Sequence, residues 1–96
     1  MNEGELPEGG MRKAVIDSTP ILLAKVEGRV HAMFDRCFHM GCPLSRGTLD
    51  GHIVTCPCHD WRYDVRTGVF VDAKEIMLPT YECKIEDGMI MIRLED

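Results

Sequence analysis

Apolar residues in this chain occur in short runs separated by turn-forming pairs, and no run repeats with the period of a helix. Two pairs of runs stand out: residues 21–26 and 29–34 around Glu27-Gly28, and residues 81–85 and 89–92 around Asp87-Gly88. An acidic residue followed by glycine between two apolar runs favours a tight hairpin turn. We therefore predict two antiparallel hairpins, one in each half of the chain.

Further strands are predicted at residues 14–16 and at residues 53–55, the second of them after another Asp-Gly pair. In the last hairpin, Tyr81, Cys83 and Ile85 alternate with polar residues. This alternation is typical of a strand with one buried and one solvated face. Cys83 is accordingly expected to be a core residue.

The segment between the hairpins is dense in Cys, His, Gly, Pro and Asp. We therefore expect an all-β fold, in which an antiparallel framework carries a loop-rich insert. Residues 1–10 are polar and rich in glycine, so we expect a flexible N-terminal tail there. Residues 11–96 should form a single domain, with the loop-rich subdomain at about residues 36–70.

Length and charge restrict the function. The chain has 96 residues and a formal net charge of −5, with no basic run that would bind nucleic acid. It contains no apolar stretch long enough for a membrane anchor and no basic targeting segment, which indicates a cytoplasmic protein. Its cysteines are therefore interpreted first as metal ligands or redox groups.

Two short sequences in the insert are rich in metal ligands. The first is Cys37-Phe38-His39, and sixteen residues later comes Cys56-Pro57-Cys58-His59. Each offers a cysteine and a histidine, side chains that bind iron and zinc. A 2Fe–2S centre with cysteines on one iron and histidines on the other requires this mixture. Cys37, His39, Cys56 and His59 are thus the candidate ligands of one 2Fe–2S cluster.

Other metal and redox sites fit the spacing less well. A zinc site of two cysteines and two histidines uses the same side chains but normally pairs like with like in each loop, whereas both loops here are mixed. Zinc nevertheless remains open as the alternative metal. The sequence from Cys56 to His59 misses the haem attachment motif by one residue, and no thioredoxin-type pair of cysteines is present.

The insert closely resembles the Rieske iron–sulfur family. The residues that carry the resemblance are Cys37-Phe38-His39-Met40-Gly41-Cys42, Cys56-Pro57-Cys58-His59, Trp61-Arg62-Tyr63-Asp64 and Thr67-Gly68. The resemblance extends more weakly over most of residues 12–94. It implies a β framework capped by a cluster-binding subdomain. It also implies that Cys37 and Cys56 bind the buried iron, and that His39 and His59 bind the outer iron, through which electrons pass.

The resemblance implies further roles near the cluster. Cys42 and Cys58 match a cysteine pair that forms a disulfide in respiratory members, and Tyr63 matches a tyrosine whose hydroxyl bonds a ligand sulfur. The serine of the respiratory members is replaced, because Asp60-Trp61 stands where they have Gly-Ser. This mixture is closer to ferredoxin-type members and implies a lower reduction potential. Whether the cysteine pair is bonded stays open, since a cytoplasmic location opposes it.

Residues around the ligands have more than one interpretation. Gly41 fits a tight loop, Met40 shields the cluster or serves as general packing, and Trp61 covers the cluster or contacts a partner. His31 and His52 lie outside the loops and are not expected to be ligands. Asp35 and Arg36 are expected to be solvated charges.

We expect an electron-transfer protein and not an enzyme, a soluble ferredoxin that takes single electrons from a reductase and delivers them to an oxygenase or another redox enzyme. Two alternatives stay open: a small electron-transfer subunit of a nitrite-reductase-like complex, and a zinc-stabilised interaction module.

Overall fold

The computed structural model describes residues 3–37, 41–58 and 60–93, and nearly all of its regular structure is β. The predicted all-β class is confirmed. The elements are η1 (Glu3–Glu5), β1 (Met11–Ile16), β2 (Thr19–Val26), β3 (Arg29–Phe34), η2 (Leu44–Arg46), β4 (Thr48–Asp50), β5 (Ile53–Thr55), β6 (Arg62–Asp64), β7 (Thr80–Glu86) and β8 (Met89–Arg93). No helix in these described ranges is long and apolar enough to cross a membrane.

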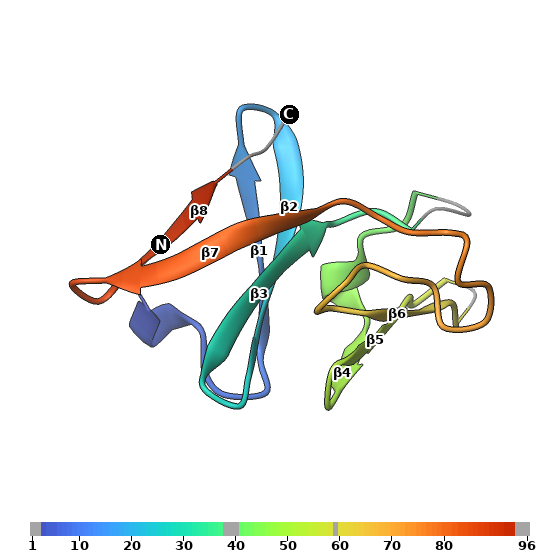
Figure 1. The fold of residues 1–96 in the computed structure, drawn as a ribbon, viewed down its shortest axis with the longest axis horizontal. Coiled ribbons are helices and arrows are strands. Elements are labelled where there is room, and N and C mark those ends of the chain that lie inside the picture. Colours follow the sequence, from blue (N-terminus) through green and yellow to red (C-terminus); the bar gives the residue numbers. More distant parts are fainter. Residues whose placement is uncertain (1–2, 38–40, 59, 94–96) are drawn as a thin grey trace.

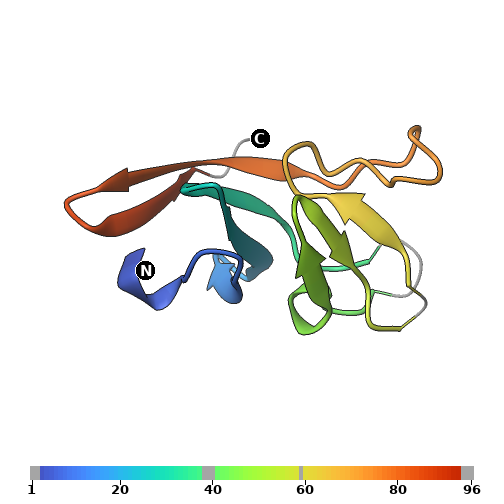
Figure 2. The same ribbon diagram turned by 90° about the horizontal axis from the view of Figure 1, so that it is seen from below.

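The strands form two antiparallel sheets. The larger has five strands in the order β1-β2-β3-β7-β8, and the smaller has three in the order β4-β5-β6. The smaller sheet is inserted in the chain between β3 and β7, which pair with each other through Ala32 and Tyr81. Figures 1 and 2 show the two sheets side by side, with the long β7–β8 hairpin extending away from the smaller sheet.

Tight turns join β2 to β3 and β7 to β8 in the larger sheet. Glu27 and Gly28 have φ values of 53° and 77°, and Asp87 and Gly88 have values of 52° and 76°. Two consecutive positive φ values define the hairpin turn that suits the twist of paired strands, and glycine adopts it without strain. Both predicted hairpins are therefore confirmed.

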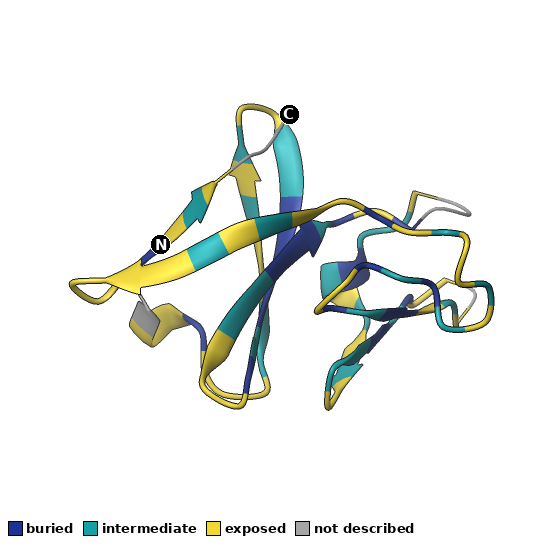
Figure 3. Cartoon of the chain, viewed as in Figure 1, coloured by how far each residue is buried: buried dark blue, intermediate teal, exposed yellow. Residues whose placement is uncertain are grey.

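Strand β2 is buried on both faces. Ile21, Leu22, Leu23 and Ala24 each have an exposed fraction of 0%. Alternate residues of this strand enter different core clusters: Leu22 and Ala24 face the smaller sheet, and Ile21 and Leu23 pack with Leu6 and with β8. Buried positions concentrate in β2, in β3 and on the small-sheet elements beside them (Figure 3). The larger sheet thus separates two cores.

The described part of the N-terminal segment packs against the larger sheet. Leu6 is 1% exposed, and the Gly9 amide donates to the carbonyl of Lys25 at 2.7 Å. The Glu8 carboxylate accepts hydrogen bonds from the amides of Glu27 and Gly28, at 2.7 and 2.9 Å, and these bonds lower its pKa. These contacts differ from those of the flexible tail that the composition led us to expect, because Leu6 packs in the second core.

Two expectations for the last hairpin need adjustment. Tyr81 and Cys83 are half-buried at the edge of the second core, but Ile85 is 39% exposed. The alternating pattern therefore ends before the strand does. Cys83 is a peripheral packing residue, because the outer half of the hairpin extends beyond the core.

We expect Leu6→Ala to lower the free energy of unfolding by about 2–4 kcal/mol, since it removes a fully buried side chain and leaves a cavity. Urea denaturation measures this change. Val15→Ala is the matched control, because Val15 is 63% exposed and its truncation should change the free energy by less than about 0.5 kcal/mol. A loss for Leu6→Ala no larger than that of the control would show that the segment is not part of the core.

Candidate metal centre

The two sequences that carry the candidate ligands form loops with the same backbone hydrogen-bond pattern. In the first, the Cys37 amide donates to the carbonyl of Cys42 at 2.9 Å, and the Gly41 amide donates to the carbonyl of Cys37 at 2.8 Å. In the second, the Cys56 amide donates to the carbonyl of Trp61 at 2.7 Å, and the Asp60 amide donates to the carbonyl of Cys56 at 3.1 Å. Each cysteine is thus bonded to residues four and five positions further along.

The backbone conformation repeats as well. Gly41 and Asp60, each four residues after the first cysteine of its loop, have φ values of 70° and 58°. The left-handed region suits glycine, and aspartate is among the few other residues that enter it often. The described parts of the two loops are therefore equivalent in backbone conformation, although their sequences differ.

Both loops bury their first cysteine. Cys37 is 3% exposed and Cys56 is 0% exposed, and each belongs to the larger core cluster. The hydroxyl oxygen of fully buried Tyr63, on β6, lies 3.5 Å from the Cys37 sulfur. This contact is the one that the sequence resemblance implied. Two thiols are therefore held in apolar surroundings, and a hydroxyl is aimed at one of them.

Aromatic rings pack beside this tyrosine. Trp61 is half-buried and stacks on Phe70, with ring centroids 4.3 Å apart and planes inclined by 5°. The Tyr63 ring also packs against Phe70, with ring centroids 5.5 Å apart. Trp61 is therefore engaged in packing at the end of the second loop, where its backbone carbonyl also receives the Cys56 amide.

A disulfide joins the two loops. Cys42 and Cys58 are bonded, with their Cα atoms 6.5 Å apart, so the structure has the cross-loop pair that the sequence left open. The sulfurs of Cys42, Cys56 and Cys58 all lie within 4.8 Å of one another. Disulfide sulfurs are not thiolates, so this triplet is not a three-thiolate metal site. The thiols available for metal here are Cys56 and Cys37.

Three of the candidate residues, His39, Met40 and His59, lie outside the described residues. Of the remaining ligand candidates, the structure buries the two cysteines in equivalent positions. The donor chemistry fits an iron–sulfur cluster, because soft thiolates in a dry site with a nearby hydrogen-bond donor are what such clusters use.

Asp35 was expected to be a solvated charge, and this was wrong. Its side chain is 1% exposed, and its two oxygens accept hydrogen bonds from the amide and hydroxyl of Ser45, at 2.7 and 2.6 Å. Its neighbour Arg36 is exposed, as expected. Strand alternation does not indicate this burial, because β3 ends at Phe34 and buries side chains on both of its faces.

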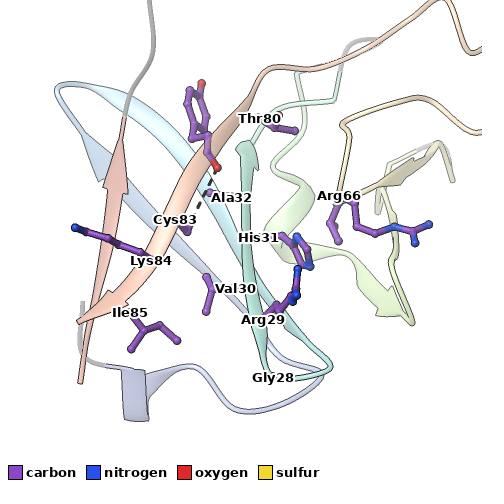
Figure 4. A pocket seen from close by; sticks show the side chains of 12 residues that line it. Gly28, Arg29, Val30, His31, Ala32, Arg66, Thr80, Cys83, Lys84 and Ile85 are labelled. Carbon is purple, nitrogen blue, oxygen red and sulfur yellow. Dashed lines mark hydrogen bonds between the residues drawn. The ribbon is translucent and has the colours of Figure 1, made fainter. Parts of the chain in front are cut away.

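A pocket of about 460 Å³ lies elsewhere, along β3 and β7 (Figure 4). His31 and Arg29 project from β3 toward Arg66, and Cys83 lines the wall on β7. None of its lining residues is a candidate ligand, so this pocket is separate from the thiol loops. Burial raises the pKa of Cys83 to about 11, which keeps it a neutral thiol and a poor metal ligand.

Comparisons with known proteins agree with this geometry. The family model of the Rieske [2Fe-2S] domain matches residues 1–82. The ferredoxin component of a naphthalene 1,2-dioxygenase system from Pseudomonas aeruginosa is 35% identical over 94% of this chain and 88% of its own. The ferredoxin subunit of a 3-phenylpropionate/cinnamic acid dioxygenase from Photorhabdus laumondii is 37% identical over 96% of this chain and 89% of its own.

A solved complex of reduced oxygenase and oxidized ferredoxin in carbazole 1,9a-dioxygenase contains a similar chain, with a TM-score of 0.87 and 25% identity over 96% of both chains. The ferredoxin of carbazole 1,9a-dioxygenase from Nocardioides aromaticivorans shares the fold, with a TM-score of 0.91. The chain belongs to the Rieske [2Fe-2S] domain family. It is an electron-transfer protein with a Rieske-type 2Fe–2S cluster as its cofactor.

We expect the double variant Cys42→Ala/Cys58→Ala to lower the free energy of unfolding by about 3 kcal/mol, the chain-entropy value for a bridge that closes a loop of this length. Urea denaturation with and without a thiol reductant measures it. Reductant should have the same effect on the wild type and none on the double variant. Cys83→Ala, which removes a free cysteine, is the control and should keep its sensitivity to reductant.

We expect stability to fall as the pH drops below about 6.5, in part through His31. Burial is the main cause that lowers the pKa of His31. The charges of His52, Arg29 and Arg66 lower it further, and the charge of Asp64 partly opposes them. Below the ordinary histidine pKa the unfolded chain then binds more protons than the folded chain, so acid favours unfolding. His31→Gln should reduce the difference between unfolding free energies measured at about pH 7.5 and about pH 5.5. An unchanged difference would contradict this assignment.

Proposed function

We propose that Cys37, His39, Cys56 and His59 bind the 2Fe–2S cluster, and that the chain passes single electrons from a reductase to an oxygenase. The observation that carries the ligand assignment is the equivalence of the two loops, each of which buries one thiol at the same position. In the sequence, a histidine follows each of these cysteines by two or three residues. The loops thus supply the mixed ligand set that such a cluster requires.

The cluster, when bound, supplies one-electron redox chemistry. The chain's own residues set the conditions for that chemistry. The Tyr63 hydroxyl, beside the Cys37 sulfur, stabilises additional negative charge there and so favours the reduced state. The packed core beneath Cys37 and Cys56 excludes water. With Trp61 in place of the respiratory serine, we expect a potential below that of the respiratory members.

The proposed domain organisation follows from the same features. Both loops and the whole of the smaller sheet fall within residues 36–70, which we assign as the cluster-binding subdomain. We assign the rest of the chain from residue 11 to the framework, and residues 3–10 pack against that framework. We place the protein in the cytoplasm, where the disulfide, whose Cys58 side is exposed, would meet a reducing environment.

The oxygenase is proposed as the electron acceptor because the relatives that this chain matches over most of their length are ferredoxin components of dioxygenase systems. A net charge of −5 would suit docking to a basic surface on such a partner. Mixing the reduced protein with a purified Rieske-type dioxygenase tests this step, and rapid reoxidation without added mediator supports it.

We expect the protein purified without oxygen to be red-brown, and its reduced form to give the electron paramagnetic resonance signal of a histidine-ligated 2Fe–2S cluster. His39→Ala and His59→Ala should each abolish that signal, because each removes a ligand. His52→Ala is the matched control, since His52 lies on the turn between β4 and β5 and should leave the signal intact. A colourless wild-type protein with one zinc per chain would overturn the proposal.

A further inference from the structure

Among the residues that the structure describes, Asp35 is the one charged residue that is buried in the core. Its amide donates to the carbonyl of Pro20 on β2 at 3.0 Å, and its carboxylate accepts both hydrogen bonds from Ser45, which lies in η2. A buried carboxylate is costly unless hydrogen bonds compensate for lost water. The residue therefore connects the framework directly to the turn that follows the first loop.

The two equivalent loops differ in how their bases are closed. The second loop lies between β5 and β6, and Thr55 pairs with Arg62 immediately outside it. The first loop has a strand only on its N-terminal side, because Cys42 is followed by Pro43 and the turn η2. Proline has no amide hydrogen to donate to a strand ladder. Instead of a strand ladder, the Asp35–Ser45 hydrogen bonds join the two chain segments that flank the first loop.

The same turn also contacts the second loop. Gly47, directly after η2, lies so close to β5 that a Cβ atom there would collide with the carbonyl oxygen of Thr55. Thr55 immediately precedes Cys56. Ser45 is thus part of a short segment that rests against the strand leading into the second buried thiol.

We infer that Asp35 is a positioning residue for the cluster: through Ser45 it closes the first ligand loop and fixes Cys37 relative to Cys56. This inference rests on the proposed ligand assignment. Both hydrogen bonds of the carboxylate go to Ser45, so its action on the loop passes through the backbone between residues 35 and 45. Its negative charge also lies in the core two residues from Cys37.

The test compares Asp35→Asn, Ser45→Ala and Ser45→Thr in the cluster-loaded protein. Asp35→Asn replaces the charge-assisted bonds with weaker neutral ones, and Ser45→Ala removes the hydroxyl bond. Each change should accelerate cluster release to a chelator by about tenfold. Ser45→Thr retains the hydroxyl and should release its cluster at the wild-type rate. Asp64→Asn is the control, because it removes a part-buried carboxylate that Arg66 bonds outside the loops.

The reduction potential separates positioning at the cluster from general stability. Asp35→Asn removes a buried negative charge, so its potential should rise, since the reduced cluster is the more negative state. Ser45→Ala leaves the Asp35 carboxylate with one hydrogen-bond donor fewer, so its negative charge is less compensated. The reduction potential of the cluster in this variant should therefore fall. The inference would be overturned if Asp35→Asn and Ser45→Ala released the cluster no faster than Asp64→Asn. It would also be overturned if the reduction potentials of Asp35→Asn and Ser45→Ala shifted in the same direction. If Asp35→Asn does not fold, Ser45→Ala and Ser45→Thr carry the comparison. A wild type without a cluster would instead refute the proposed function.

Discussion

The packing of the three-stranded sheet against one face of β2 and β3 is the constraint on which the rest of the structure depends. The two ligand loops arise from different sheets, the first after β3 and the second between β5 and β6. They meet because Leu22 and Met33 of the larger sheet share one core with Val54 and Tyr63 of the smaller sheet. Burial of such side chains contributes about 1.5–3 kcal/mol each.

This arrangement imposes a requirement on the opposite face. If β2 buries one face against the smaller sheet, its other face needs a cover of its own, because its apolar side chains would otherwise face water. Leu6 and Ile90 supply that cover. The N-terminal segment therefore supports the metal centre indirectly, by completing the second core behind the strand on which the first core is built.

Elements specified by local chemistry were predictable from the sequence, and elements specified by distant contacts were not. Gly28 and Gly88 mark their turns because few other residues tolerate positive φ, whereas Asp17 and Ser18 adopt the same conformation without a glycine. The three-residue strands β4 and β6 have no pattern of their own and exist because β5 pairs with both. Leu6 is a single apolar residue in a polar segment, so nothing local shows that it is buried.

The same distinction applies to the site. A ligand set could be proposed from the sequence because metal chemistry constrains residue type and spacing together. The bond between Cys42 and Cys58 depends on a distance between two loops, which spacing does not provide. Asp35 was misjudged because a charge is usually solvated, and its burial depends on hydrogen bonds from Ser45, ten residues further along the chain.

Several independent contacts shape each loop. Backbone bonds close both loops, the disulfide joins them, the core buries their first cysteines, and the Asp35–Ser45 bonds replace a missing strand ladder. Each of these contacts joins one part of the chain to another, so each helps to offset the conformational entropy lost when the two thiols are ordered. A positive φ at Asp60 adds backbone strain of order 1–3 kcal/mol, which persists only where the surroundings determine the conformation. The second loop tolerates that strain because the β5–β6 ladder holds its base. The first loop has no such ladder, and it uses glycine at the equivalent position.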